Sequence, residues 1–217
     1  MQTAPFKNFI FTLMLVFSTV VAPVSAQTAD EIIGKVRQKY EGLKQVCADF
    51  TQTFHWKLAD ETQVIKGQIC AKDGVKFRIE SQDQLIITDG KTIWTMNKAN
   101  KQVMVDNADK ASGDNPFLKS YLKKYTEEYK GELLGTEKTG EVDFYHLKLA
   151  AKNEDQFVRQ VDFWVDSKTF FLTKVQQVDI NDNSTAYEVE NVKIDVILKD
   201  ATFTFSAPEG YEVIDLR

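Results

Sequence analysis

The sequence has few of the residues that enzymes use for catalysis or for holding a metal ion. Its 217 residues include two histidines, two cysteines, four prolines and ten glycines. No carboxylate pair, cluster of metal ligands or glycine-rich phosphate loop stands out along the chain. We therefore expect a protein that is not an enzyme and that uses no metal and no cofactor.

Long hydrophobic runs are also missing beyond the first 26 residues, which argues against a later membrane-spanning helix. The first 26 residues resemble a secretory signal peptide, because Lys7 gives a weak positive start, residues 9–22 are apolar and residues 24–26 are small. An uncleaved membrane anchor is the alternative, but the small residues favour cleavage before Gln27. We thus expect an exported, soluble single domain at 27–217. No cysteine directly follows the cut to carry a lipid of its own.

An excess of positive charge is absent as well. The formal net charge of the chain is −5, and loss of Lys7 with the leader would take it to −6. Nucleic acids and anionic headgroups are bound through basic surfaces. The charge therefore argues against a nucleic-acid partner and against a polybasic membrane contact.

What the chain does contain is a short helical pattern followed by many strand patterns. Thr28 and Glu31 fit a capping box, and apolar residues recur at helical spacing over 30–44. From Ala48 onward every second residue tends to be large and apolar, which is typical of strands. We expect strands near residues 48–58, 63–71, 75–80, 84–88, 92–97, 102–106, 131–137, 142–150, 157–166, 170–180, 185–198 and 201–206. The turns between most of them are short and polar, which indicates antiparallel neighbours.

A second amphipathic helix is predicted over 116–125, headed by Asn115 and Pro116 and preceded by a polar stretch. No internal repeat and no domain linker interrupt the chain. The expected fold is mainly β (α+β): roughly ten antiparallel strands curl into an incompletely closed barrel, and the helices cover its concave face. An exported sheet that is rich in apolar side chains and poor in catalytic groups suggests a binder of something apolar.

The two cysteines, Cys47 and Cys70, lie at the far ends of a predicted hairpin that turns near residues 59–60. Two free, buried thiols are one interpretation. We favour a disulfide, because an even number of cysteines in an exported chain is typical of one.

Two motif matches have simpler explanations. Asp179, Asn181, Asn183 and Glu190 occupy ligand positions of a calcium loop, but Ser184 stands where that loop needs glycine, so we expect a hairpin turn. A Ser-x-x-Lys pattern at residues 120–123 and a Lys-Thr-Gly at 138–140 match penicillin-recognising enzymes. The chain lacks the Ser-Asp-Asn element of those enzymes and the large helical domain between the motifs. A hydrolase is therefore disfavoured.

Several short phrases, taken in order, carry a family resemblance over nearly the whole mature chain. They are Phe50-Thr51-Gln52, Gly67, Lys76-Phe77-Arg78, Thr88-Asp89-Gly90-Lys91-Thr92-Ile93-Trp94, Asn115-Pro116-Phe117 and the stretch from Phe203 to Gly210. Together they resemble the periplasmic outer-membrane lipoprotein carrier (LolA-type) family. The Asp-Gly-Lys-x-x-Trp phrase is the most specific of them.

The resemblance implies an unclosed β-barrel with a helical lid, whose concave side holds the acyl chains of lipoproteins. It implies a soluble chaperone in the periplasm of a Gram-negative bacterium, which takes acylated lipoproteins from an inner-membrane ABC transporter and delivers them to an outer-membrane acceptor. We expect a monomer.

The resemblance and the strand alternation together suggest which side chains meet the lipid. The expected cavity residues are Phe50, Phe54, Phe77, Ile79, Ile87, Trp94, Met96, Phe163 and Val165, and the expected lid residues are Phe117, Leu118, Tyr121 and Leu122. Ordinary core packing is the alternative for any single one of them. The inward face is uncertain by one residue, because a one-residue slip in register reverses every side chain.

One feature departs from the family pattern. Family members place an arginine before a proline after the second strand, where the arginine holds the lid closed, but Asp73 and Gly74 stand here. Arg78 is a candidate substitute latch, with a surface charge as the alternative. A second function from another class is a regulatory module that uses the same half-barrel to sense lipids or lipoproteins in the periplasm.

Overall fold

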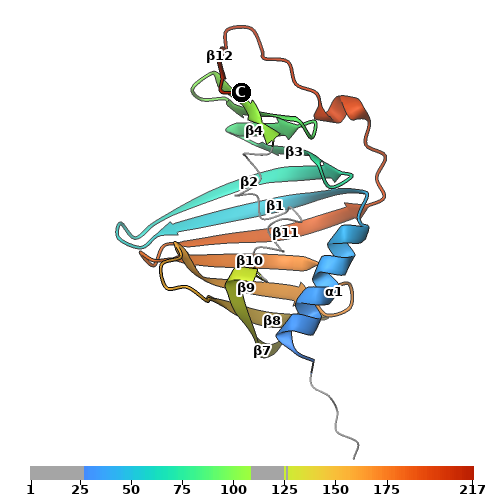
Figure 1. The fold of residues 1–217 in the computed structure, drawn as a ribbon, viewed down its shortest axis with the longest axis vertical. Coiled ribbons are helices and arrows are strands. Elements are labelled where there is room, and N and C mark those ends of the chain that lie inside the picture. The colour runs from blue at the N-terminus through green and yellow to red at the C-terminus, as the bar shows by residue number, and fades with distance from the viewer. Residues whose placement is uncertain (1–26, 109–124, 126) are drawn as a thin grey trace, which may run out of the picture.

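The computed structural model describes residues 27–108, 125 and 127–217. One α-helix, α1 (Ala29–Gly42), precedes the first strand, and a short 3-10 helix, η1 (Asp200–Phe203), follows the eleventh. The strands are β1 (Gln45–Trp56), β2 (Glu61–Lys72), β3 (Lys76–Ser81), β4 (Gln84–Thr88), β5 (Thr92–Asn97), β6 (Gln102–Asn107), β7 (Tyr129–Thr139), β8 (Val142–Ala151), β9 (Val158–Asp166), β10 (Leu172–Asp179), β11 (Ser184–Ile194) and β12 (Glu212–Asp215). Figure 1 shows their arrangement.

All twelve strands belong to one curled sheet with the order β12-β6-β5-β4-β3-β2-β1-β11-β10-β9-β8-β7. Every neighbouring pair is antiparallel except β12 and β6, which are parallel. The two end strands, β12 and β7, do not pair with each other, so the sheet does not close into a barrel. The predicted mainly β, incompletely closed fold is confirmed.

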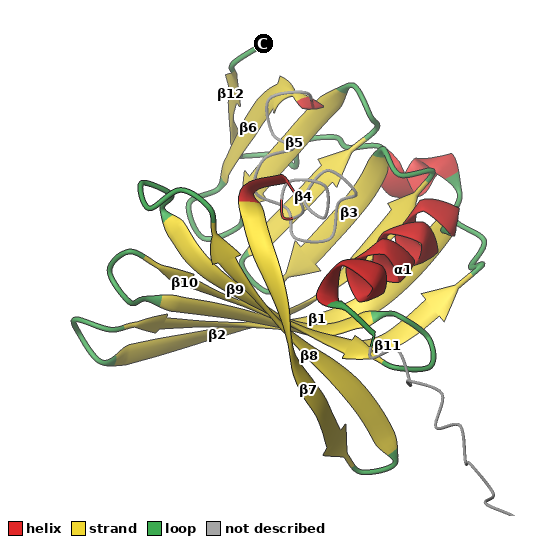
Figure 2. Cartoon of the chain, turned by 60° about the horizontal axis from the view of Figure 1, so that its bottom comes forward, coloured by secondary structure: helices red, strands yellow, loops and turns green. Residues whose placement is uncertain are grey.

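The helix α1 begins where the sequence predicts. The Thr28 hydroxyl accepts the backbone N–H of Glu31, and the Glu31 carboxylate accepts the N–H of Thr28, which completes the capping box. The apolar stripe of α1 buries Ile32, Ile33 and Val36 against β8, β9 and β10 in the largest core of the protein. We call the side of the sheet on which α1 packs the α1 face (Figure 2), and the other side the outer face.

Strand register decides which side chains share the α1 face, because residues directly opposite each other in an antiparallel pair point to the same side. Phe50 on β1 lies opposite Val189 on β11 and Gly67 on β2. Continuing across the sheet, Phe77 and Ile79 remain on the α1 face, whereas Leu85, Ile87, Trp94, Met96, Val103 and Val105 point to the outer face.

The chain that follows β11 covers this outer apolar surface. We call residues 195–217 the C-terminal strap. Its Phe205 and Tyr211 pack on the outer-face cluster of Leu85, Ile87, Met96, Val103 and Val105, and Phe205 stacks on Trp94 with ring centres 6.1 Å apart. Asp200 on the strap accepts hydrogen bonds from Lys72 at 2.9 Å and Lys76 at 3.1 Å. The strap thus forms the second layer at this end of the molecule.

The strand predicted over 201–206 is wrong. Residues 200–203 form η1, and the segment after it extends over the sheet without joining a ladder, while β12 was not predicted. The alternation of Phe203 and Phe205 with threonines has another cause. Phe203 is buried as the last residue of η1, and Phe205 packs on the outer-face cluster from the extended segment that follows.

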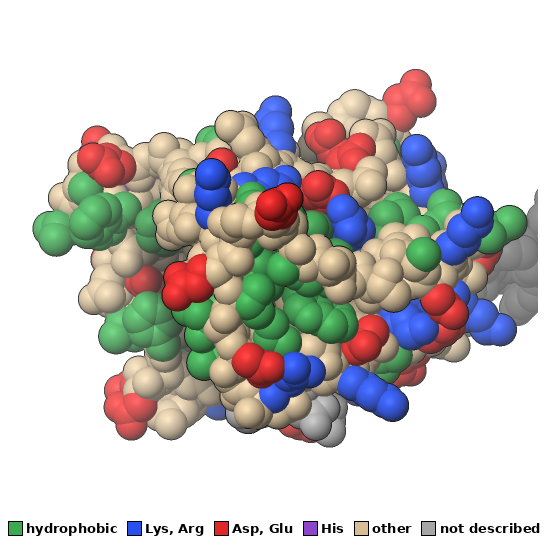
Figure 3. Space-filling view, turned by 90° about the horizontal axis from the view of Figure 1, so that it is seen from above, with side chains coloured by type: hydrophobic (Ala, Val, Ile, Leu, Met, Phe, Trp, Pro, Cys, Tyr) green, Lys and Arg blue, Asp and Glu red, His purple; other side chains and the backbone are tan. Residues whose placement is uncertain are grey.

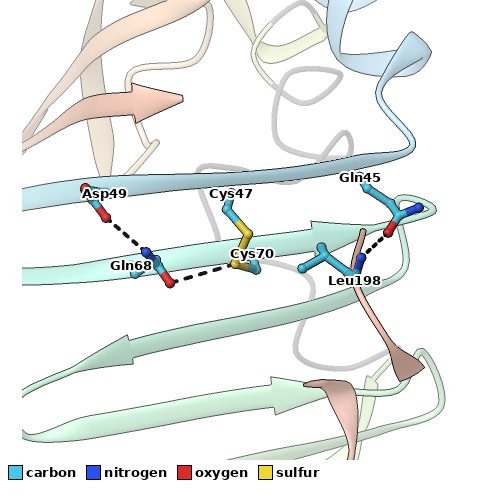
Figure 4. The surroundings of a disulfide bond; sticks show 6 residues. All are labelled: Gln45, Cys47, Asp49, Gln68, Cys70 and Leu198. Atoms are coloured by element: carbon cyan, nitrogen blue, oxygen red, sulfur yellow. Dashed lines mark hydrogen bonds between the residues drawn. A yellow bond between two sulfur atoms is a disulfide. The ribbon is translucent and has the colours of Figure 1, made fainter. Parts of the chain in front are cut away.

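Two local predictions concern the outer face and a turn. Cys47 and Cys70 lie opposite each other on β1 and β2 and are joined by a disulfide with an S–S distance of 2.06 Å (Figure 4). Between β10 and β11, the Asp179 carboxylate accepts the backbone N–H groups of Asn181 and Asn183 and the Asn183 side-chain amide. These bonds make the segment a tight hairpin turn.

The second predicted helix and its lid residues, Phe117, Leu118, Tyr121 and Leu122, lie outside the described residues, as does the predicted signal peptide.

Candidate functional site

An apolar pocket opens on the α1 face beside the C-terminal end of α1. Its empty volume is about 440 Å³, which includes space open to solvent. The lining comes from α1 and the residue after it, from the first half of β1, from the end of β2, from β11 and from the residue before β10. These residues are Tyr40, Leu43, Val46, Ala48, Ile69, Ala71, Phe171, Val189 and Val192. No lining residue carries a formal charge at neutral pH.

The pocket exists because α1 stops short and the strands beneath carry small residues. Gly42 is the last helical residue, and Leu43 turns into extended backbone, so α1 does not cover β1 and β2 here. Ala48 and Ala71 on these strands are too short to fill the space.

Tyr40 closes the side of the pocket toward the main core. Its ring meets Phe171 edge-on at 5.9 Å, and its hydroxyl oxygen accepts the backbone N–H of Leu172 at 3.3 Å. Burial raises the pKa of Tyr40 to about 12, because the charged phenolate would lose its hydration there. The phenol therefore stays neutral.

Phe50 lies beside the pocket on β1, and a glycine on β2 leaves room for its ring. Phe50 is buried with Ala48 and Ile69, and its ring extends over Gly67 on β2. A Cβ atom at Gly67 would lie 2.8 Å from the Phe50 ring and 2.3 Å from the carbonyl oxygen of Glu80. Glycine at 67 thus lets Phe50 lie against the sheet beside the pocket.

Beyond Phe50, the same face of β1 continues with Gln52, Phe54 and Trp56. We call the side chains of Val46, Ala48, Phe50, Gln52, Phe54 and Trp56 on the α1 face the β1 lane. At its far end Phe54 is 36% exposed and Trp56 46% exposed. The β1–β2 and β10–β11 hairpins turn on the left of Figure 1, and Figure 3 shows hydrophobic side chains gathered on that side of the molecule. The lane thus runs from a sheltered pocket to an open, apolar rim.

The structure separates the nine expected cavity residues into three places. Phe50, Phe54, Phe77 and Ile79 lie on the part of the α1 face that α1 does not reach. Phe163 and Val165 share that face but are fully buried beneath α1.

The other three, Ile87, Trp94 and Met96, point to the outer face under the strap. Alternation within β4 and β5 identifies them as one group. The register places Ile87 opposite Arg78, and so on the side of the sheet away from the pocket.

The pocket lining itself was missed in the sequence. Part of it could have been found by extending the alternation of β1 toward the N-terminus, because Val46 and Ala48 lie on the same face of the strand as Phe50. The contributions of Phe171, Val189 and Val192 come from chain segments more than 100 residues away, and no local pattern joins them to β1.

Arg78 also points to the outer face. Its guanidinium donates to the Glu80 carboxylate at 2.6 Å, and this bond holds the pKa of Glu80 below its usual range. Lys98 lies 3.5 Å from the same carboxylate. In this placement Arg78 pairs with its own strand and faces away from the pocket.

The most concentrated polar cluster lies on the outer face of β7, β8 and β9. His146 lies between the carboxylates of Glu137 at 2.6 Å and Asp162 at 3.0 Å, and its ring stacks on Trp164. The Trp164 indole N–H donates to Glu137, and this bond, with His146, lowers the pKa of Glu137. No described serine or cysteine nucleophile joins the cluster in these contacts, and both cysteines are in the disulfide.

Among the described residues, no group of three or more His, Cys, Asp and Glu side chains is placed to hold a metal ion. No helix in this part of the chain is long and apolar enough to span a membrane. The pocket and lane are lined mainly by apolar side chains and can bind an apolar ligand.

Comparison with known proteins gives a family and a fold. The family model described as "Outer membrane lipoprotein carrier protein LolA" matches residues 41–206. An outer-membrane lipoprotein carrier protein of Glaesserella parasuis serovar 5 is 27% identical over 192 residues, which cover 86% of this chain and 87% of that protein.

An uncharacterised protein of Methanocaldococcus jannaschii is also 27% identical, over 212 residues and 96% of this chain, but the chain spans only 61% of that relative's length. Among solved structures, a conserved protein of Thermus thermophilus superposes with a TM-score of 0.58 at 12% identity, covering 86% of this chain and 98% of the other. At that identity the likeness shows the fold alone.

Proposed function

This chain belongs to the LolA family of outer membrane lipoprotein carrier proteins, and on that premise we propose that it binds the acyl chains of lipoproteins on its α1 face. In this role it is a periplasmic chaperone that moves lipoproteins from the inner to the outer membrane and catalyses no reaction. The curated relative from Glaesserella parasuis bears the name of such a carrier.

The observation that supports this proposal best is the open pocket that continues into the β1 lane. Where α1 covers this face, the side chains of the helix and of the sheet form a closely packed core. Around the pocket the face is equally apolar, yet the described residues leave it partly open, and the β1 lane ends at the exposed Phe54 and Trp56. Uncovered apolar surface in a folded protein marks a place where an apolar partner binds.

The size of the pocket sets how much lipid it can hold. The empty volume of about 440 Å³ includes space open to solvent, so it is an upper bound, and the pocket itself shelters no more than part of one acyl chain. A chain of about fifteen methylenes contributes about 12 kcal/mol when fully buried, which is comparable to a nanomolar complex before the costs of ordering.

Three chains buried to the same extent would exceed the ceiling of about 18–21 kcal/mol for non-covalent binding. A carrier must also release its cargo. We therefore infer that one chain has its methyl end in the pocket and continues along the partly exposed lane, where the other chains also lie, so that a stronger acceptor can remove the anchor.

The partners follow from the same proposal. An inner-membrane ABC transporter would load the carrier with ATP-driven work, and an outer-membrane acceptor would unload it. The chain would act as a monomer, and its first 26 residues would be removed on export. The lid role of Phe117, Leu118, Tyr121 and Leu122 remains a prediction from the sequence.

Filling the pocket tests the proposal directly. The variant Ala71→Phe places a ring in the pocket, and the matched control Lys66→Phe places one on an exposed outer-face position of the same strand. Both proteins are expressed with the leader and purified from the periplasm. Bound acylated peptides are then measured by mass spectrometry, and fluorescent fatty-acid binding by titration.

We expect wild type and Lys66→Phe to carry acylated protein, and Ala71→Phe to bind fatty acid at least tenfold more weakly at unchanged thermal stability. Equal binding by all three would overturn the pocket assignment. A wild-type protein that carries no lipid but elutes with a soluble protein partner would favour the sensing module instead.

A further inference from the structure

Four polar side chains interrupt the apolar α1 face just beyond the pocket. Gln52 on β1 lies opposite Tyr187 on β11, and its Nε2 lies 3.5 Å from the Tyr187 hydroxyl oxygen. On β10, Nε2 of Gln177 donates to the Tyr125 hydroxyl at 2.7 Å. All four side chains are buried or half-buried. We call these four residues the polar row.

The strand register brings the two pairs close together. Tyr187 lies opposite Val175, and Gln177 lies opposite Thr185, so Gln177 is a diagonal neighbour of Tyr187 on the same face. Diagonal neighbours in an antiparallel pair are about 7–8 Å apart. The polar row therefore crosses three adjacent strands, β1, β11 and β10, as one continuous feature.

The row lies at a defined distance from the pocket. Phe50 is one step back along the β1 lane, and Ala48 and Val46 of the pocket lining are the next two. Six residues of strand separate Gln52 from Val46, which is about 20 Å and comparable to an extended acyl chain. A chain whose methyl end fills the pocket would therefore place its polar end near Gln52.

The chemistry of the row favours an uncharged acceptor. The row contains two carboxamides and two phenols, and no Lys, Arg, Asp or Glu, so it offers a carboxylate or phosphate no counter-charge. A carboxamide has two N–H donors and a carbonyl acceptor. The Gln52 contact of 3.5 Å lies at the long limit for a hydrogen bond, so a better acceptor on a ligand can compete for this amide.

We propose that the polar row binds the ester or amide carbonyl groups that join acyl chains to their anchor, and so makes the carrier selective for acylglycerol-type anchors over plain hydrocarbon. This inference rests on the proposed function, because it assigns the polar end of the ligand whose tail fills the pocket. Carbonyl oxygens accept hydrogen bonds from the amide of Gln52, and Gln177 supplies a second amide along the row.

The test compares two glycerol lipids of equal chain length, one with two ester-linked and one with two ether-linked chains. The ether lipid keeps the tails and loses the carbonyls. Each lipid displaces aminoanthracene from purified wild type and from Gln52→Leu and Gln177→Leu. The control Gln176→Leu changes the neighbouring amide, which points to the outer face opposite Asp162.

We expect wild type and Gln176→Leu to bind the diester about fivefold more tightly than the diether, the effect of one net hydrogen bond. Gln52→Leu should bring the ratio close to one, and Gln177→Leu should lower it, while diether affinity stays unchanged in both.

Three results would overturn the inference and leave the carrier proposal standing. They are equal binding of both lipids by wild type, retained ester preference in both Leu variants, and equal weakening of both lipids, which would indicate a structural role. If neither lipid displaces the dye from wild type, the proposed function itself fails.

Discussion

In the core beneath α1, the buried apolar side chains of β8, β9 and β10 point to the α1 face, whereas a second cluster on β4, β5 and β6 points to the outer face beneath the C-terminal strap. That cluster consists of Leu85, Ile87, Met96, Val103 and Val105. Among the described residues, α1 covers the first core and the C-terminal strap covers the second, on opposite sides of the sheet. The pocket lies between them, where α1 has ended and the strap covers the other face. Burial of apolar side chains is therefore common to both cores, whereas the pocket is left partly open by the residues that the structure describes.

The largest loss of stability is expected when a side chain is removed from the core beneath α1. Phe163 is 1% exposed beneath α1. Because truncation leaves a cavity that the packed neighbours cannot fill, Phe163→Ala should lower the free energy of unfolding by about 3–5 kcal/mol in urea denaturation. Phe54→Ala, at the open end of the lane, should cost less than about 1 kcal/mol and yet weaken fatty-acid binding. Equal destabilisation by both would mean that the lane is ordinary core.

A smaller loss of stability is expected at Gly67, where the Phe50 ring packs closely against the sheet. Gly67→Ala would push a methyl group against the Phe50 ring and the Glu80 carbonyl oxygen, so the strand must shift. We expect a loss of about 1–3 kcal/mol in unfolding free energy, together with weaker lipid binding as Phe50 moves.

The control for this variant is Gly34→Ala on α1, where a new Cβ meets nothing within 4 Å. It should stabilise the protein by roughly 0.5–1 kcal/mol, because alanine has the higher helix propensity. A neutral Gly67→Ala would show that Phe50 has room to spare.

The smallest effect concerns the strap. Hydrogen bonds from Lys72 and Lys76 hold the pKa of Asp200 below its usual 3.8. A carboxylate whose folded pKa is lowered stabilises the fold above its unfolded pKa, and this contribution is lost as pH falls through the folded value. Asp200→Asn should therefore lower the melting temperature slightly at neutral pH, and the difference from wild type should begin to shrink below about pH 4 and vanish once the pH is below the folded pKa of Asp200.

Asp195→Asn, an exposed strap position, serves as the control. A difference for Asp200→Asn that grows with acidification would contradict the ion-pair assignment. Lipid affinity should be unchanged in both variants, because Lys72, Lys76 and Asp200 lie on the outer face.

Much of the architecture could be predicted from local patterns. The capping box at Thr28 places the start of α1, and the alternation from Ala48 onward places β1 and the strands after it. These signals are local, because a cap or a pleat is built from residues a few positions apart.

The side of the sheet on which a strand buries its apolar residues could not be predicted in the same way. Leu85, Ile86 and Ile87 are all apolar, and a shift of one residue in the β3–β4 pairing would have turned Ile87 toward the pocket. The pocket was hidden for a related reason, since its walls come from residues as far apart as Tyr40 and Val192, and small residues such as Ala71 carry no pattern.

The central claim, that lipid tails bind the α1 face and not the outer face, can be tested with the protein's own tryptophans. Trp56 lies on the α1 face, while Trp94 and Trp164 lie on the outer face. Variants that keep one of the three, with phenylalanine at the other two, are titrated with a fatty acid brominated along its tail. A fourth protein lacks all three and carries Phe171→Trp as a reporter in the pocket.

Bromine quenches tryptophan fluorescence at short range. We predict strong quenching of Phe171→Trp and of the protein that keeps Trp56, and none of those that keep Trp94 or Trp164. Quenching of Trp94 without quenching of Phe171→Trp would place the lipid beneath the C-terminal strap and contradict the account.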